Sequence, residues 1–256
     1  MNGQRLKGSY FFRTLSANDE EILVANGGDI GSNRYSDLIH DVVRAQKPDL
    51  VVIGGDIAYD NNLGECYNVW DMMLARLPHQ YPEQRGVRLI PVIYGVGNHD
   101  LGKRSLSTAI YEENENSPVY KKFFPQHFPY MVDADGKETV TERRVPEMHE
   151  RRTFTSHTFA DKMLVLSLDA GYGEPHGPLQ SNWISQKLKE HAWMNYSFTH
   201  YHNPLVPGCS KGLGESMEAG HKYWIPVFDR QGLTMSWENH VHALKRSFPI
   251  KNYKKE

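Results

Sequence analysis

Cysteine is scarce in this sequence, and long apolar runs are missing from it. The chain has only Cys66 and Cys209, which are too few for a disulfide framework and lack the paired spacing of a thiolate zinc site. The sequence leaves open a single disulfide bond between these two cysteines. No run of 18 apolar residues occurs, so no membrane span is predicted. Residues 1–13 hold no apolar core followed by a small-residue cleavage site, so no secretory signal is predicted either.

An excess of charge of either sign is also lacking. The formal net charge of -2 gives no basic footprint for nucleic acid, and the short basic clusters at 143–144, 151–152 and 254–255 are interpreted as solvated surface. Hydrophobic residues make up 39% and charged residues 23% of 256 residues, a balance typical of a globular protein with a substantial core. We therefore expect one domain over residues 1–256.

Short apolar runs alternate with helical patterns along the chain. The runs at residues 22–25, 50–53 and 90–94 each end in glycine and a polar residue, which is typical of the strands of βαβ units. Between the first two runs, Leu38, Ile39, Val42 and Val43 form a helical stripe. Further strands are predicted at 152–159, 163–168, 196–201 and 233–237, and helices near 69–77, 183–191 and 221–228. The polar stretch from residue 100 to about 152 is interpreted as loop and rim. The sequence thus predicts an α/β fold.

Five polar blocks follow the predicted strands. Open α/β sheets bind ligands at the carboxyl ends of their strands, where loops converge and glycine lets the backbone come close. The blocks mix carboxylate oxygen with imidazole nitrogen, a set that suits Fe, Zn or Mn better than Ca or Mg. In chain order they are Gly28-Asp29-Ile30-Gly31, Gly55-Asp56-Ile57-Ala58-Tyr59, Gly97-Asn98-His99-Asp100, His200-Tyr201-His202-Asn203-Pro204 and Asn239-His240-Val241-His242.

Each block taken alone has an ordinary structural interpretation. A Gly-Asp pair after a strand is more often a turn with a helix cap than a metal site. Five of the 13 histidines, however, fall between His200 and His242. His240 and His242 are two residues apart at the predicted end of a strand, so we expect both side chains on one face, where they can serve neighbouring metals. Together the five blocks favour metal ligation.

In this order the blocks resemble the calcineurin-like metallophosphoesterase superfamily, over about residues 22–249. The resemblance implies a four-layer α/β/β/α sandwich with two mixed sheets. Tyr59, three residues after Asp56, resembles the tyrosine of the purple acid phosphatase branch, in which phenolate binds a ferric ion. That resemblance implies two metal ions, Fe(III) with Fe(II), Zn(II) or Mn(II).

The ligands implied by the resemblance form two sets that share one carboxylate. They are Asp29, Tyr59, His242 and Asp56 for the first metal, and Asn98, His202, His240 and Asp56 for the second. His99 resembles the histidine that contacts phosphate or protonates the leaving group, and Asp100 would orient it. His200 and His221 fall where substrate contacts could lie, with an ordinary structural histidine an equal alternative for each.

Three features depart from the family pattern. Asn239 stands where the last block usually has glycine. Residues 10–14 resemble the closing strand of a β-sandwich that precedes the catalytic domain in many purple acid phosphatases, so residues 1–16 are interpreted as a remnant of that domain. The chain also ends before the last strands that family members usually have, and its C-terminal strands are therefore expected to be truncated.

The implied activity is hydrolysis of a small phosphate ester by an acid phosphatase-like enzyme, with metal-bound hydroxide attacking phosphorus. A phosphodiesterase or nucleotide hydrolase on the same fold is the first alternative, and a degenerate metal-binding domain without activity is the second. No nucleic-acid or membrane partner is expected, and the oligomeric state is open. A secreted or periplasmic location is implied only by the resemblance to the family.

Overall fold

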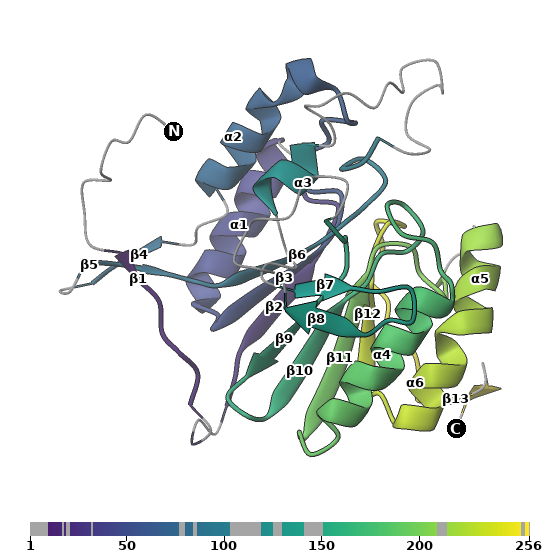
Figure 1. Ribbon diagram of the computed structural model, residues 1–256. Coiled ribbons are helices and arrows are strands. Elements are labelled where there is room, and N and C mark those ends of the chain that lie inside the picture. Colours follow the sequence, from purple (N-terminus) through teal and green to yellow (C-terminus); the bar gives the residue numbers. More distant parts are fainter. Residues whose placement is uncertain are drawn as a thin grey trace.

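The computed structural model describes residues 10–16, 18, 21–31, 33–76, 80–83, 86–102, 119–124, 130–140, 151–208, 214–251 and 254–255. Two sheets lie face to face at its centre, with helices on both outer sides (Figure 1). The α/β class predicted from the sequence is confirmed. None of the helices in the described part of the chain has both the length and the apolar character needed to cross a bilayer.

The first sheet contains three parallel strands in the order β2-β3-β6, which are Val24–Gly27, Leu50–Gly54 and Val92–Gly95. All five residues of β3 are buried, as expected for the central strand of a covered parallel sheet. Helix α1 (Arg34–Gln46) joins β2 to β3, and α2 (Asn68–Arg76) follows the 3₁₀ turn η1 (Gly64–Cys66). Both lie on the outer side of this sheet with the short helix α3 (Val119–Phe123) (Figure 1).

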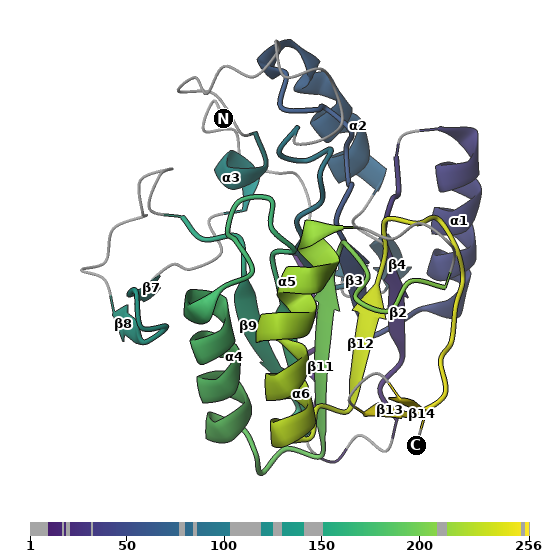
Figure 2. The same cartoon turned by 90° about the vertical axis from the view of Figure 1, so that its right-hand side faces the viewer.

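The second sheet has the order β12-β11-β10-β9 and is mixed. Strands β10 (Met163–Ser167), β11 (Tyr196–Tyr201) and β12 (Met235–Glu238) are parallel, whereas β9 (Thr155–Phe159) runs antiparallel to β10. Helices α4 (Pro178–Glu190), α5 (Glu215–Tyr223) and α6 (Ile225–Gln231) cover its outer face (Figure 2). The four expected layers are therefore present, but one sheet is mixed and the described strands of the other are all parallel.

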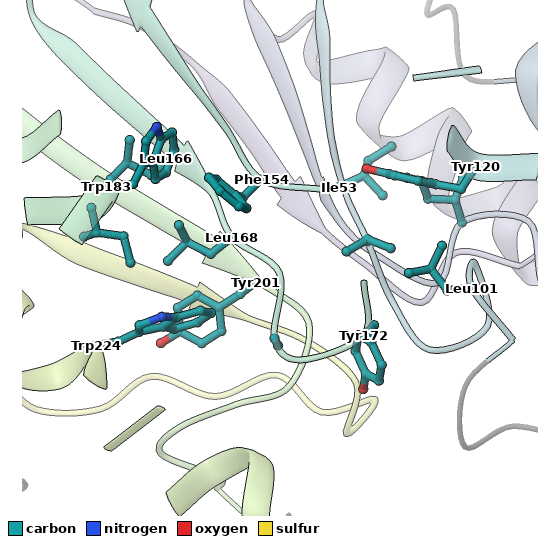
Figure 3. Close-up of a cluster of buried hydrophobic side chains, with 14 of the residues drawn as sticks. Ile53, Leu101, Tyr120, Phe154, Leu166, Leu168, Tyr172, Trp183, Tyr201 and Trp224 are labelled. Carbon is teal, nitrogen blue, oxygen red and sulfur yellow. The ribbon is translucent and has the colours of Figure 1, made fainter. Parts of the chain in front are cut away.

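Two apolar clusters hold these layers together. Leu50, Val52 and Ile93 of the first sheet pack against Met163 and Val165 of the second. A larger cluster extends outward on both sides and includes Ile53, Phe154, Leu166, Trp183 and Trp224, which are labelled in Figure 3. At about 25 cal/mol for each Å² of apolar surface removed from water, this burial is the main force that fixes the sheets.

The smaller elements lie at the margins. A three-stranded sheet has the order β1-β5-β4, with β1 at Tyr10–Phe11, β5 at Gly86–Leu89 and β4 at Gln80–Glu83. Two hairpins pair β7 (Tyr130–Val132) with β8 (Glu138–Val140), and β13 (Ile250–Lys251) with β14 (Lys254–Lys255). The idea that residues 1–16 belonged to a preceding domain stays a prediction, because residues 1–9 lie outside the described residues.

Two sequence expectations change. The helix expected at 221–228 is two helices that meet at Trp224, with Pro226 in the first turn of α6, where its missing N–H leaves no bond unmade. Part of the stretch interpreted as loop forms α3 and the β7-β8 hairpin. Residues 103–118, 125–129 and 141–150 of that stretch lie outside the described residues. Cys66 is free, and Cys209 also lies outside the described part.

Candidate metal centre

Asp29 lies in the loop after β2, next to the loop after β3. Its backbone N–H donates to the Gly55 carbonyl at 3.0 Å, which ties the two loops together. One carboxylate oxygen, Oδ2, accepts the N–H of His240 at 2.8 Å. The other, Oδ1, is buried, accepts no hydrogen bond from a described residue and lies 3.1 Å from His242 Nε2. Burial raises the pKa of Asp29. A buried carboxylate oxygen of this kind is costly unless it is paired or bound to a cation.

Asp56, which is 1% exposed, is at the middle of the site. Its Oδ1 accepts the His99 N–H at 2.8 Å, and its Oδ2 lies 3.0 Å from His202 Nε2. Burial opposes ionisation, but the hydrogen bond and charge of His202 hold the pKa of Asp56 below its ordinary value. Asp56 therefore connects the loops after β3, β6 and β11.

His202 follows β11 and is fully buried. Its Nδ1 lies 2.9 Å from the Gly54 carbonyl, to which only an N–H can donate, so Nε2 is the nitrogen that faces the site. Nε2 lies 3.1 Å from Asn98 Oδ1 and 3.0 Å from His240 Nδ1. Burial lowers the pKa of His202, but the bond to Asp56 outweighs it and raises the pKa to about 8. Burial, aided by His202, lowers the pKa of His240 to about 4.

Four of the predicted ligands offer atoms within 4.8 Å of one another: Asp29, Asp56, His202 and His240. Asn98 joins them through its contact with His202, and His242 through its contact with Asp29. Two carboxylates with two imidazoles form a donor set that suits Zn, Fe or Mn. A cation here would also satisfy the unpaired oxygen of Asp29. The residues thus fit the metal centre that the sequence predicted.

Several site residues have a left-handed backbone, which is uncommon for residues other than glycine. Asp29 has φ 54°, Asp56 has 52°, Tyr59 has 59°, His240 has 68° and His242 has 50°. Such residues cost of order 1 kcal/mol each and cluster where geometry serves function. Their gathering here supports a functional centre over a chance meeting of turns.

The prediction that His240 and His242 lie on one face at the end of a strand is wrong. Strand β12 ends at Glu238, so both histidines lie in the following loop and not on a strand. Left-handed turns bring their side chains to the site instead, His240 against His202 and His242 against Asp29. The His242 side chain is 67% exposed, whereas that of His202 is buried, so this side of the site is open.

A groove of about 930 Å³ extends from that open side. It runs from Asp29 and His242 along β12 toward β13, and its wall combines apolar side chains with Lys245, Arg246 and Lys251. The lining also holds Asp229 and Glu238, and Glu238 pairs with Lys245, so the groove beside the open side of the cluster carries charges of both signs.

Asn239 fills the place of the glycine expected in the last block. A Cβ on Gly54 would lie 1.8 Å from Asn239 Nδ2, and one on Gly28 would lie 2.7 Å from its Cγ. The amide Nδ2 also donates to the Tyr201 carbonyl at 3.1 Å. The asparagine side chain therefore occupies space that two glycines on the first sheet leave open, and it anchors the loop that carries His240.

Asp100 does not orient His99. Its carboxylate accepts three backbone N–H groups, from Asp56, Ile57 and Gly97, each at 2.8 Å. Burial and the charge of Asp56 raise the pKa of Asp100 to about 8, while these donors act in the opposite direction. The role that the sequence assigned to Asp100 is corrected to holding the loops after β3 and β6 together.

The side chain that forms a hydrogen bond with the His99 ring is that of Asn61, whose Oδ1 lies 2.5 Å from His99 Nδ1. Sequence reasoning missed it. The Asn61-Asn62 pair could have indicated a tight turn at this point, because asparagine tolerates the left-handed backbone that both residues adopt. His99 Nε2 then points toward Asp56, 4.0 Å from its Oδ2. Burial lowers the pKa of His99, which favours the neutral ring.

Tyr59 packs on His99, with ring centroids 4.4 Å apart. Burial, and next the charges of Asp56, Asp29 and Asp100, raise the pKa of Tyr59. Because both burial and these negative charges disfavour the phenolate form, a cation would be needed to stabilise it.

The two remaining histidines lie away from the opening. His200 is fully buried on β11, against Gly95 of the first sheet, a position that does not support a substrate contact. His221 on α5 is half-buried, with its Nε2 2.6 Å from the Leu205 carbonyl. Both positions agree better with the ordinary structural alternative.

Residues 24–235 match the family model described as calcineurin-like phosphoesterase. This range exceeds half of the chain, so the protein belongs to the calcineurin-like phosphoesterase family, whose members act on phosphate esters with a dinuclear metal centre. The match ends before His240 and His242, so those two positions depend on the geometry alone.

The solved structure described as "Structure of PhoD" is similar in fold, with a TM-score of 0.55 and 12% sequence identity. The match covers 89% of this chain and 52% of that chain, so this protein spans about half the length of that structure. At such low identity the likeness shows the fold alone. No curated protein matches the sequence.

Proposed function

We propose that this protein is an acid phosphatase-like hydrolase of phosphate monoesters, with a dinuclear centre of the purple acid phosphatase type. The observation that carries the proposal is the meeting of Asp29, Asp56, His202 and His240 within 4.8 Å. Tyr59 packs on the ring of His99, whose backbone N–H donates to Asp56. Donor groups from four strand-end loops are thus gathered at one point.

The proposed ligands form two sets around Asp56. Asp29, Tyr59 and His242 are the proposed ligands of Fe(III), because a phenolate and carboxylates suit the harder, more highly charged ion. Asn98, His202 and His240 are the proposed ligands of a divalent ion, Fe(II), Zn(II) or Mn(II). When bound, the two ions would supply Lewis acidity toward the phosphoryl oxygens and lower the pKa of water.

The chain's own residues have separate tasks. Asn61 Oδ1 accepts the Nδ1–H of His99 and so holds the ring. Nε2 is therefore an acceptor in the neutral ring, and it is the protonated ring that would donate from Nε2 to a phosphoryl or leaving-group oxygen. Asp100 fixes the loops that carry Asp56 and Asn98 through three backbone bonds. The exposed His242 leaves one side of the cluster open for a phosphate group.

A metal and colour measurement tests this proposal. Iron-loaded, oxidised protein should be pink to purple, since phenolate bound to Fe(III) absorbs visible light. Tyr59→Phe should bleach the colour with only a modest loss of stability, and Tyr67→Phe, which changes a tyrosine that is 58% exposed, should keep it. Ferric iron verified at the site without colour would remove the purple assignment and leave the family assignment standing.

A substrate panel separates the alternatives. Faster hydrolysis of diesters than of monoesters would indicate a phosphodiesterase. A salt-dependent affinity for DNA would favour a nuclease. Bound metal without turnover of any phosphate ester would indicate a degenerate metal-binding domain.

A further inference from the structure

Helix α1 turns its apolar side toward solvent. Tyr35 is 59%, Leu38 61%, Ile39 62% and Val42 64% exposed, and their spacing of i, i+3, i+4 and i+7 places them in one stripe. Single exposed apolar residues are ordinary, but a continuous stripe marks an interaction surface. We call these four residues the α1 stripe.

The opposite side of α1 meets the protein through polar residues and through Val43, which packs against the larger apolar cluster. Ser36 is 2% and His40 5% exposed. A capping box between Asn33 and Ser36 fixes the start of the helix, and Asp37 pairs with Arg76 of α2 at 2.9 Å. The helix cannot turn its stripe inward without exposing Ser36 and His40 and breaking the pair between Asp37 and Arg76. The outward orientation is therefore built into the fold.

We propose that the α1 stripe pairs with α1 of a second copy of this chain, in an antiparallel homodimer. Apolar stripes of this spacing pack helix against helix. In a pair related by a twofold axis near Leu38, Tyr35 of one copy lies opposite Val42 of the other. The stripe is thus complementary to itself.

The charges beside the stripe favour a second copy over an unrelated partner. Arg34 and Asp41 are seven residues apart, so they lie on the same flank of the helix, with a drift of only about 20°. In the antiparallel pair, Arg34 of each copy faces Asp41 of the other. This gives two ion pairs between the copies, in addition to the pair that Asp41 makes with Arg44 of its own helix at 3.1 Å. In a parallel pair, each flank meets the opposite flank of the partner helix, so Arg34 would not face Asp41.

Sedimentation of the full chain over a dilution series tests the proposal. The wild-type protein should form a dimer that dissociates on dilution, and Leu38→Asp should raise its dissociation constant by about 100-fold or more, because a charge would be buried at the centre. Trp193→Asp, which changes a residue that is 61% exposed elsewhere, should leave the constant unchanged. Circular dichroism would verify that each variant is folded.

A charge exchange tests the arrangement. Arg34→Asp alone should weaken the dimer by roughly tenfold, since two symmetry-related pairs are lost and like charges meet. Adding Asp41→Arg to it should restore the constant to within about threefold of wild type. A wild-type chain that stays monomeric at about 100 µM, a dimer unaffected by Leu38→Asp, or a failure of the exchange to restore binding would each overturn the proposed pairing.

Discussion

Acidification should destabilise the fold through His176. This residue is 8% exposed, its ring centroid lies 4.3 Å from that of Trp224, and its Nε2 makes no hydrogen bond to a described residue. Burial lowers the pKa of His176 to about 4. The folded protein thus keeps this ring neutral at a pH where the unfolded chain protonates it.

The sign and size follow from linkage. Above pH 6.5 the ring is neutral in both states, so it has no effect on stability there. As the pH falls from 6.5 toward 4, only the unfolded state gains the proton, and stability is lost. With an unfolded pKa of about 6.5, the loss between pH 7 and pH 5 is about 2 kcal/mol.

Urea unfolding at pH 7 and pH 5, followed by circular dichroism, would measure this loss. His176→Phe keeps a ring against Trp224 and has no titratable group, so its free energy of unfolding should fall by about 2 kcal/mol less than that of wild type. Other groups that titrate in this range, such as Asp60 with a pKa raised to about 7 by burial, change alike in both proteins. Trp224→Phe disturbs the same packing but keeps His176, so its pH dependence should match wild type.

Equal losses in wild type and His176→Phe would refute the reasoning. The result also bears on function, because an acid phosphatase assay at pH 5 would act on a protein less stable than at pH 7. Activity lost at low pH should therefore be compared with the folded fraction at the same pH.

Three further predictions concern the site. Active protein should hold two metal ions per chain by elemental analysis, Asp56→Ala should lose both, and one ion or none in active wild-type protein would contradict the dinuclear arrangement. His99→Ala should keep both ions and lower turnover of an alkyl phosphate by roughly 10²–10⁴-fold, whereas an unchanged rate would remove His99 from the mechanism. Gly54→Ala should displace the Asn239 side chain and lower the melting temperature and metal content together, because the new Cβ would lie 1.8 Å from its amide; a stable, metal-loaded variant would show that the loop can adapt.

The strand-end motifs were predictable from local pattern. Apolar runs that end in Gly-Asp or Gly-Asn locate Asp29, Asp56 and Asn98, since the parallel strands that carry them must end at the same edge. His202 could be placed by the same logic on the second sheet. Periodicity and residue type were sufficient for these positions.

Other features depend on geometry that a linear pattern does not contain. A helical stripe such as that of α1 shows which residues share a face, but not whether that face meets the core or solvent. The contact of Asn61 with His99 depends on a left-handed turn between distant loops. The position of His242 depends on the chain leaving β12 at Glu238, which a period of two could not reveal.

The hydrogen bond between the His240 N–H and Asp29 joins residues 211 positions apart in the chain. During synthesis, the loops after β2, β3 and β6 therefore emerge long before the loop that completes the cluster. A nascent chain holds Asp29 and Asp56 without the histidines of the second sheet, so early metal capture would meet an incomplete set of donors. The full set of donors can therefore assemble only after the loop that follows β12 has emerged from the ribosome.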